Sequence, residues 1–204
     1  MEGLGFGTAY ETAIFRESID RLVKKYQIKQ VLEYPITNLL NDFQYKASTG
    51  QIGPPETNHD LVWSFCHFEQ NEDSDQFIDD LADKTNRYLL VAIQNNRNPG
   101  LTLHWFYHKI IGKEWDHGKI GKMSPKKLRK AVTKNNFTIL EDDFHDLPWF
   151  ILDVYECGHF LKKLVPRSLL NEQDVKPSKF EGWPRIIKSF LAHHYQVLAE
   201  KSKS

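Results

Sequence analysis

Hydrophobic positions recur along this chain with two periods, one typical of helices and one typical of buried strands. Phe15, Ile19, Leu22 and Tyr26 return at helical spacing with charged residues between them, so we expect an amphipathic helix over residues 8–25. Three continuous apolar runs are instead typical of strands that are buried on both faces of a parallel sheet. They occupy residues 31–35, 60–66 and 88–93.

Helical and extended patterns continue to alternate in the second half. Ser124 suits a helix cap and Pro125 the first turn of a helix that ends near residue 135. The other predicted helices are 75–84, 101–111 and 183–193, and the other predicted strands are 137–140 and 195–199. Together these elements predict an α/β fold.

The short distance between the first two predicted strands restricts the topology. Residues 36–47 suit a short helix and residues 48–55 suit a loop, which makes a single crossover. A strand, helix and strand unit needs about 30 residues, so two further units do not fit there. We therefore predict a shortened, mostly parallel sheet that is flanked by helices.

Length, charge and cysteine content are ordinary and exclude little. The 204 residues, 40% of them hydrophobic, predict a single domain with an N-terminal helix (1–28), an α/β core (29–200) and a frayed tail (201–204). Lys plus Arg (27) equals Asp plus Glu (27), so net charge does not indicate a nucleic-acid or membrane partner. The two cysteines lie far apart and no apolar signal opens the chain, which predicts a cytoplasmic location. No apolar run approaches the roughly 20 residues of a membrane helix.

Four segments, in their order and spacing, resemble class I S-adenosylmethionine (SAM)-dependent methyltransferases, in particular small archaeal and bacterial members. The segments are GFGTAYE at 5–11, VLEYP at 31–35, DLVWSFC at 60–66 followed by Glu69, and WDHG at 115–118. The resemblance implies a Rossmann-like fold, SAM as the cofactor and methyl transfer to an acceptor whose identity the residues do not name. It covers about the first 120 residues.

Two departures from the family pattern bear on the cofactor. The turn after the first strand, residues 35–40, lacks the glycines that let the family's backbone approach the methionine part of SAM. The family's second and third strands, which support contacts with the ribose and the adenine, lack room here. The resemblance implies that the family order 3-2-1-4-5-7-6 shortens to 1-4-5-7-6.

This shortening has consequences for both partners and function. The first strand becomes an edge, to be covered by residues 36–58, by the N-terminal helix, or by a second copy or partner subunit. We expect a methyltransferase-like protein with impaired or lost cofactor binding in the isolated chain. The alternative is a non-catalytic binding or regulatory subunit built on the same fold.

The resemblance also implies a set of site residues. Those expected to bind SAM are Tyr10, Glu33, Pro35, Ser64 and Phe65, the last four of them near its methionine end. Those expected around the acceptor are Asn95, His104, His108 and Trp115.

Asp116 and His117 are the candidate catalytic residues. Histidine titrates near neutral pH and a carboxylate can orient it, so this pair could act as the general base. The alternative is a loop held by packing of Trp115 and by a turn hydrogen bond of Asp116.

His104 and His108 are four residues apart, which is the spacing of paired metal ligands on a helix, and Asp116 with His117 could add more. Trp105 stands where a zinc hydrolase would carry glutamate, and the neighbours are aromatic. We therefore predict packing or a substrate wall, and no metal.

Cys66 and two charged runs complete the candidates. Cys66 ends a predicted strand, where it could be a nucleophile or a buried structural thiol. The acidic run 69–80 is interpreted as the solvated first turns of a helix. The basic run 119–134 is interpreted as a solvated helix, with phosphate contact as the alternative.

Overall fold

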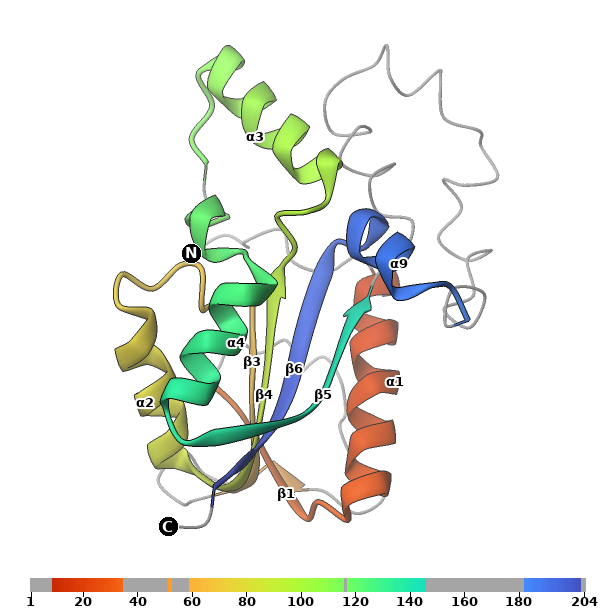
Figure 1. The fold of residues 1–204 in the computed structure, drawn as a ribbon, viewed down its shortest axis with the longest axis vertical. Coiled ribbons are helices and arrows are strands. Elements are labelled where there is room, and N and C mark those ends of the chain that lie inside the picture. The colour runs from red at the N-terminus through yellow and green to blue at the C-terminus, as the bar shows by residue number, and fades with distance from the viewer. Residues whose placement is uncertain (1–8, 35–50, 53–58, 116, 146–181, 203–204) are drawn as a thin grey trace.

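A mixed six-stranded sheet forms the centre of the protein (Figure 1). The computed structural model describes residues 9–34, 51–52, 59–115, 117–145 and 182–202. The strand order is β2-β1-β3-β4-β6-β5, in which β2, β1, β3 and β4 are parallel and β6 is antiparallel to β4 and β5. The strands are β1 (Gln30–Glu33), β2 (Gln51–Ile52), β3 (His59–Phe65), β4 (Thr85–Gln94), β5 (Phe137–His145) and β6 (His194–Lys201). The predicted α/β class is confirmed.

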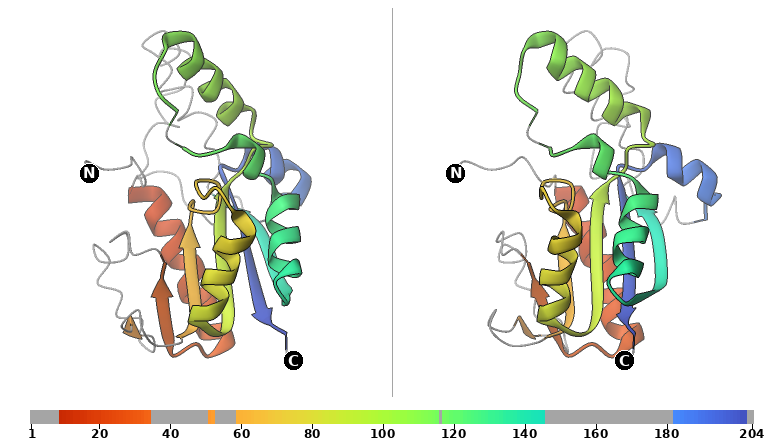
Figure 2. Two further views of the ribbon diagram at one scale, coloured as in Figure 1. Left: turned by 90° about the vertical axis from the view of Figure 1, so that its left-hand side faces the viewer. Right: turned by 60° about the vertical axis from the view of Figure 1, so that its left-hand side comes forward.

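Helices cover both faces of this sheet. Helix α1 packs on one face, α2 and α4 lie on the other, and α3 projects beyond the end of β4 (Figures 1 and 2). The helices are α1 (Ala9–Tyr26), α2 (Ser74–Lys84), α3 (Pro99–Ile111), α4 (Pro125–Lys134) and α9 (Arg185–Leu191), with a 3-10 turn η1 (Ile120–Lys122). Among the described helices, none combines the length and the apolar character of a membrane-spanning segment.

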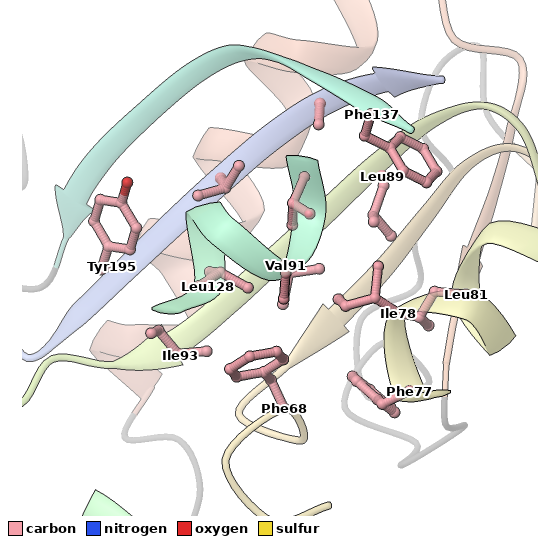
Figure 3. Close-up of a cluster of buried hydrophobic side chains, with 14 of the residues drawn as sticks. Phe68, Phe77, Ile78, Leu81, Leu89, Val91, Ile93, Leu128, Phe137 and Tyr195 are labelled. Atoms are coloured by element: carbon pink, nitrogen blue, oxygen red, sulfur yellow. The ribbon is translucent and has the colours of Figure 1, made fainter. Parts of the chain in front are cut away.

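Alternate strand residues supply two separate cores. Leu61 and Trp63 of β3 join the core under α1, whereas Val62 joins the core under α2 and α4, because successive side chains point to opposite faces. Figure 3 shows this second core, where side chains from α2 and α4 pack onto the central strands. The labelled members are Phe68, Phe77, Ile78, Leu81, Leu89, Val91, Ile93, Leu128, Phe137 and Tyr195.

Local capping explains where several helices begin. The Asp73 carboxylate accepts hydrogen bonds from the N–H groups of Asp75 and Gln76, so α2 begins at Ser74. Asn98 caps α3 by accepting from Gly100 N–H, and α3 therefore starts two residues before its predicted limit. Ser124 occupies the N-cap of α4 as predicted, but its side chain makes no capping hydrogen bond.

The edge of the sheet differs from the simplest expectation. Gln51 and Ile52 form β2 and pair with Gln30 and Val31, so the segment 36–58 supplies a short outer strand beside β1. The predicted helix 36–47 lies outside the described residues. At the other terminus, Lys201 belongs to β6 and pairs with Phe137, so the strand extends into the predicted tail; residues 203–204 lie outside the described ranges.

Candidate functional site

Polar side chains gather beyond the carboxyl ends of β3 and β4. They come from the loop after β3, from the end of β4, from α3 and from residues 112–119 that follow α3. The carboxyl ends of parallel strands are where α/β proteins bind ligands. This edge is therefore the candidate functional site.

A cluster of three histidines, hereafter the histidine cluster, lies at this edge. It consists of His104 and His108, one turn apart on α3, and His117 from the following loop. The ring centroid of His104 lies 4.6 Å from that of His108 and 5.3 Å from that of His117, and the remaining pair is 6.1 Å apart. His104 and His108 are each only 3% exposed, whereas His117 is half-buried.

Trp115 packs against all three members of the histidine cluster. Its ring centroid lies 5.6 Å from His104, 5.4 Å from His108 and 4.6 Å from His117. The indole N–H donates a 2.6 Å hydrogen bond to the carbonyl of Gly118, which fixes the ring relative to the loop. Trp115 thus contacts two of the residues predicted around the acceptor, His104 and His108, and the candidate base His117. Its own contact with an acceptor stays a prediction.

Gly118 holds this loop against the backbone of Glu69. Its φ of +91° is in the left-handed region, and a Cβ there would lie 2.8 Å from the carbonyl oxygen of Glu69. Lys119 N–H donates to the same carbonyl at 2.9 Å. Only glycine fits this close approach, and the approach fixes the position of His117 one residue earlier.

Glu69 is a buried carboxyl group that the sequence interpretation missed. The prediction that residues 69–80 are the solvated first turns of a helix is wrong here. Helix α2 begins only at Ser74, and Glu69 is fully buried in the loop after β3. Its Oε1 accepts a 2.9 Å hydrogen bond from Gln94 N–H. Burial raises the pKa of Glu69 to about 7, against the opposing effect of hydrogen bonds from Gln94 N–H and the Cys66 side chain. No period in the sequence marked this carboxyl group as buried.

Cys66 lies at the turn that leads from β3 to Glu69. Its φ of +54° is unusual for a residue with a side chain, and its N–H donates to the Ala92 carbonyl at 2.8 Å. The residue is 1% exposed, which fits the interpretation as a buried thiol. The nucleophile alternative stays a prediction.

The residues predicted to bind SAM are distributed over two faces of the sheet. Glu33 ends β1 on the α1 face, opposite Trp63, and Ser64 of β3 points to the other face. Both are buried. Phe65 packs its ring against Phe15 of α1, with centroids 4.5 Å apart.

The structure does not describe the side chains of two residues predicted to bind the cofactor and of one predicted catalytic residue. Tyr10 belongs to the first turn of α1, and only its backbone is described. Pro35 and Asp116 lie outside the described residues.

Asn95 makes structural hydrogen bonds at the end of β4. Its Nδ2 donates to the carbonyls of Ser189 and Ala192 at 2.8 and 2.9 Å, and its N–H donates to the carbonyl of His193. These bonds tie the end of β4 to the connection between α9 and β6. The predicted contact of Asn95 with an acceptor stays a prediction.

Comparison with known proteins shows similarity in structure. No family model matches the chain, and no curated protein matches it by sequence. Magnesium protoporphyrin IX methyltransferase from Synechocystis PCC 6803 with bound SAH aligns with a TM-score of 0.51 and 12% identity, over 95% of this chain and 84% of that one. A cyclopropane-fatty-acyl-phospholipid synthase-like protein from Lactobacillus casei ATCC 334 aligns with a TM-score of 0.45 and 11% identity, over 94% and 90%.

At such low identity the similarity establishes the arrangement of the chain and nothing finer. The mixed sheet, its helices on both faces and the alignment over 95% of the chain all agree with the resemblance in the sequence. The protein therefore has the fold of class I SAM-dependent methyltransferases.

Proposed function

We propose that the protein is a class I SAM-dependent methyltransferase-like protein whose isolated chain binds SAM only weakly. The observation that carries the proposal is Glu33, a buried carboxyl group at the carboxyl end of β1. SAM is cationic at both its ammonium and its sulfonium groups, and a carboxylate shielded from water attracts such charges strongly. In the family that the sequence resembles, the methionine end of SAM lies at this end of the first strand.

The weakness of binding follows from the outer edge of the sheet. The family's second strand ends in an acidic residue that accepts hydrogen bonds from the ribose hydroxyls. Here β2 has two residues, Gln51 and Ile52, and neither is acidic. One charged contact without a ribose counterpart among the described residues supports a Kd above about 100 µM rather than a micromolar Kd.

The acceptor side of the proposed site is the histidine cluster with Trp115. These side chains lie beyond the ends of β3 and β4, and β3 pairs with β1, the strand that carries Glu33. The ring centroids lie 4.6 to 6.1 Å apart, so these side chains form an aromatic wall with imidazole nitrogens along it. Such a wall suits an acceptor with a flat or apolar body and one polar reacting atom.

Calorimetric titration with SAM and with S-adenosylhomocysteine tests this function. We expect one-to-one binding with Kd above about 100 µM, about −5.5 kcal/mol, against about −8 kcal/mol for micromolar binding. Glu33→Gln should abolish the heat with SAM. Glu200→Gln, which removes a carboxylate from β6, should leave it unchanged.

The second candidate function, a non-catalytic binding subunit, is favoured by apolar side chains exposed on α3 and α9. Each is at least 40% exposed. They are Leu103, Phe106, Ile110 and Ile111 on α3, and Ile186, Ile187 and Phe190 on α9. Absence of heat and of thermal stabilisation with either compound at millimolar concentration would reject the first function in favour of this one.

A further inference from the structure

We propose that His104, His108 and His117 bind a zinc ion through one imidazole nitrogen each. This inference replaces the expectation that the cluster holds no metal, and it does not depend on SAM binding. It also changes the role of His117, because a nitrogen bound to a metal cannot accept a proton as a general base.

The geometry of the histidine cluster is close to that of a three-imidazole site. One ligand nitrogen from each residue lies within 4.8 Å of the other two. Tetrahedral zinc with bonds of about 2.0–2.1 Å holds its nitrogen ligands about 3.3 Å apart. Small rotations of the side chains therefore close the site, and the spacing of four residues on α3 already turns two of the rings to one side.

The orientation of His108 suits a metal ligand. Its Nδ1 lies 2.8 Å from the carbonyl oxygen of Glu114. A carbonyl only accepts, so Nδ1 carries the proton and Nε2 keeps its lone pair for a metal. Zinc-binding histidines are commonly held in this way, by donation from the second ring nitrogen to a carbonyl or a carboxylate.

Gln94 can orient His117 in the same manner. Its Nε2 lies 3.5 Å from His117 Nδ1, while its Oε1 is buried without a hydrogen-bond partner in the described part of the chain. A half-turn of the amide places Oε1 beside Nδ1, where it accepts the proton of that nitrogen. The rotation satisfies the buried oxygen and holds the proton of His117 on Nδ1, so Nε2 is the nitrogen that we assign to the metal.

The surroundings favour zinc and a site with one open position. Imidazole nitrogen suits zinc better than it suits magnesium or calcium, which prefer oxygen. His104 and His108 are buried beside Trp115, and His117 is half-buried, so the site is shielded on the helix side. Three protein ligands leave the fourth position of zinc for water or for an atom of the acceptor.

Metal titration of the untagged, chelator-treated protein tests the proposal. We expect one zinc ion per chain with micromolar or tighter affinity, measured by competition with a chromophoric zinc indicator. His104→Gln and His117→Gln should each weaken binding by more than about 100-fold. His67→Gln, which changes a histidine of the loop after β3, should leave the affinity unchanged. Equal affinity of the wild type and the cluster variants would overturn the proposal.

Cobalt spectroscopy keeps the test independent of how the variants fold. Cobalt(II) bound to the folded wild type should show the strong visible absorption of a four-coordinate site, and zinc should displace it. Only the weak absorption of six-coordinate cobalt would overturn the proposal. Neither readout requires SAM, so failure of this proposal is distinguishable from failure of the proposed function.

Discussion

The pKa values of two carboxyl groups are shifted in opposite directions: that of Glu69, which is fully buried at the candidate site, and that of Glu141, which is partly buried on β5. The pKa of Glu69 is raised to about 7, chiefly by burial. Burial also acts on Glu141, but hydrogen bonds from Lys25, Tyr26 and Arg21 outweigh it and lower the pKa to about 2. The difference lies in the donors that surround each group.

The comparison separates the part of the molecule that stabilises the fold from the part that is available for chemistry. Glu141 binds α1 to β5 through two cations and a phenol, so its ionised form stabilises the fold. Glu69 has a backbone N–H and a thiol beside it, so its ionised form costs stability. A carboxyl group whose pKa is raised by burial, among polar side chains at the carboxyl ends of strands, is typical of functional sites.

The largest effect is expected at Glu69. Because its pKa is raised, Glu69 does not lower the free energy of unfolding at pH values below its ordinary pKa of 4.5. As the pH rises to 7, the loss of unfolding free energy grows to about 3 kcal/mol. Glu69→Gln should therefore raise the free energy of unfolding at pH 8 and change it little at pH 4.5. Urea unfolding at the two pH values measures this difference.

A matched control is available in the same loop. Glu72→Gln alters an exposed carboxylate and should leave the pH dependence as in the wild type. If the unfolding free energies of Glu69→Gln and wild type change in parallel from pH 4.5 to 8, ionisation of Glu69 does not destabilise the fold and the contrast with Glu141 is wrong.

A smaller effect is expected at Gly118, which packs on the Glu69 carbonyl. Gly118→Ala combines a left-handed φ with a Cβ 2.8 Å from a backbone oxygen, so we expect a loss of about 2 kcal/mol in unfolding free energy. The displaced loop should also move His117 and weaken zinc binding. Thermal unfolding with and without zinc measures both effects.

Gly112 is a control that distinguishes the cost of a positive φ from the cost of a steric clash with the Cβ. Its φ is +68°, but apart from its own chain neighbours no atom of the described residues lies within 4 Å of an added Cβ, so Gly112→Ala should cost about 1 kcal/mol. Equal losses for the two variants would show that the contact with Glu69 is not what fixes the loop.

The smallest effect is expected at Glu141. Its lowered pKa gives stabilisation that is complete above pH 4.5 and is lost as pH falls towards 2. The partners are largely exposed, so Glu141→Gln should cost only about 1 kcal/mol at pH 7 and less at pH 2. Chemical unfolding at these two pH values checks it, and a larger loss at pH 2 than at pH 7 would contradict it.

The fold followed from the sequence because its signals are local. The 3.6-residue period gave α1, and the apolar runs gave β3 and β4, since both patterns report which side chains are buried. Strand β2 escaped prediction because two residues carry no periodicity. Helix limits shifted where Asn98 rather than the apolar pattern set the start.

The site was predictable only in part. The spacing of His104 and His108 placed both on one side of a helix, and their neighbour Trp115 was expected there too. The burial of Glu69 and the contact between Gly118 and its carbonyl depend on how two distant loops meet. Such contacts follow from tertiary packing, and no period in the sequence encodes them.

The order of synthesis differs from the spatial order of the strands. Strand β6 lies between β4 and β5, yet it follows both in the chain. On the ribosome, β5 therefore lacks β6, its neighbour among the described strands, until residues 194–201 emerge, and β4 exposes one side of its backbone for the same period. Pairing over such a long sequence separation is slow, so a nascent chain needs protection from association at this gap until the last strand inserts.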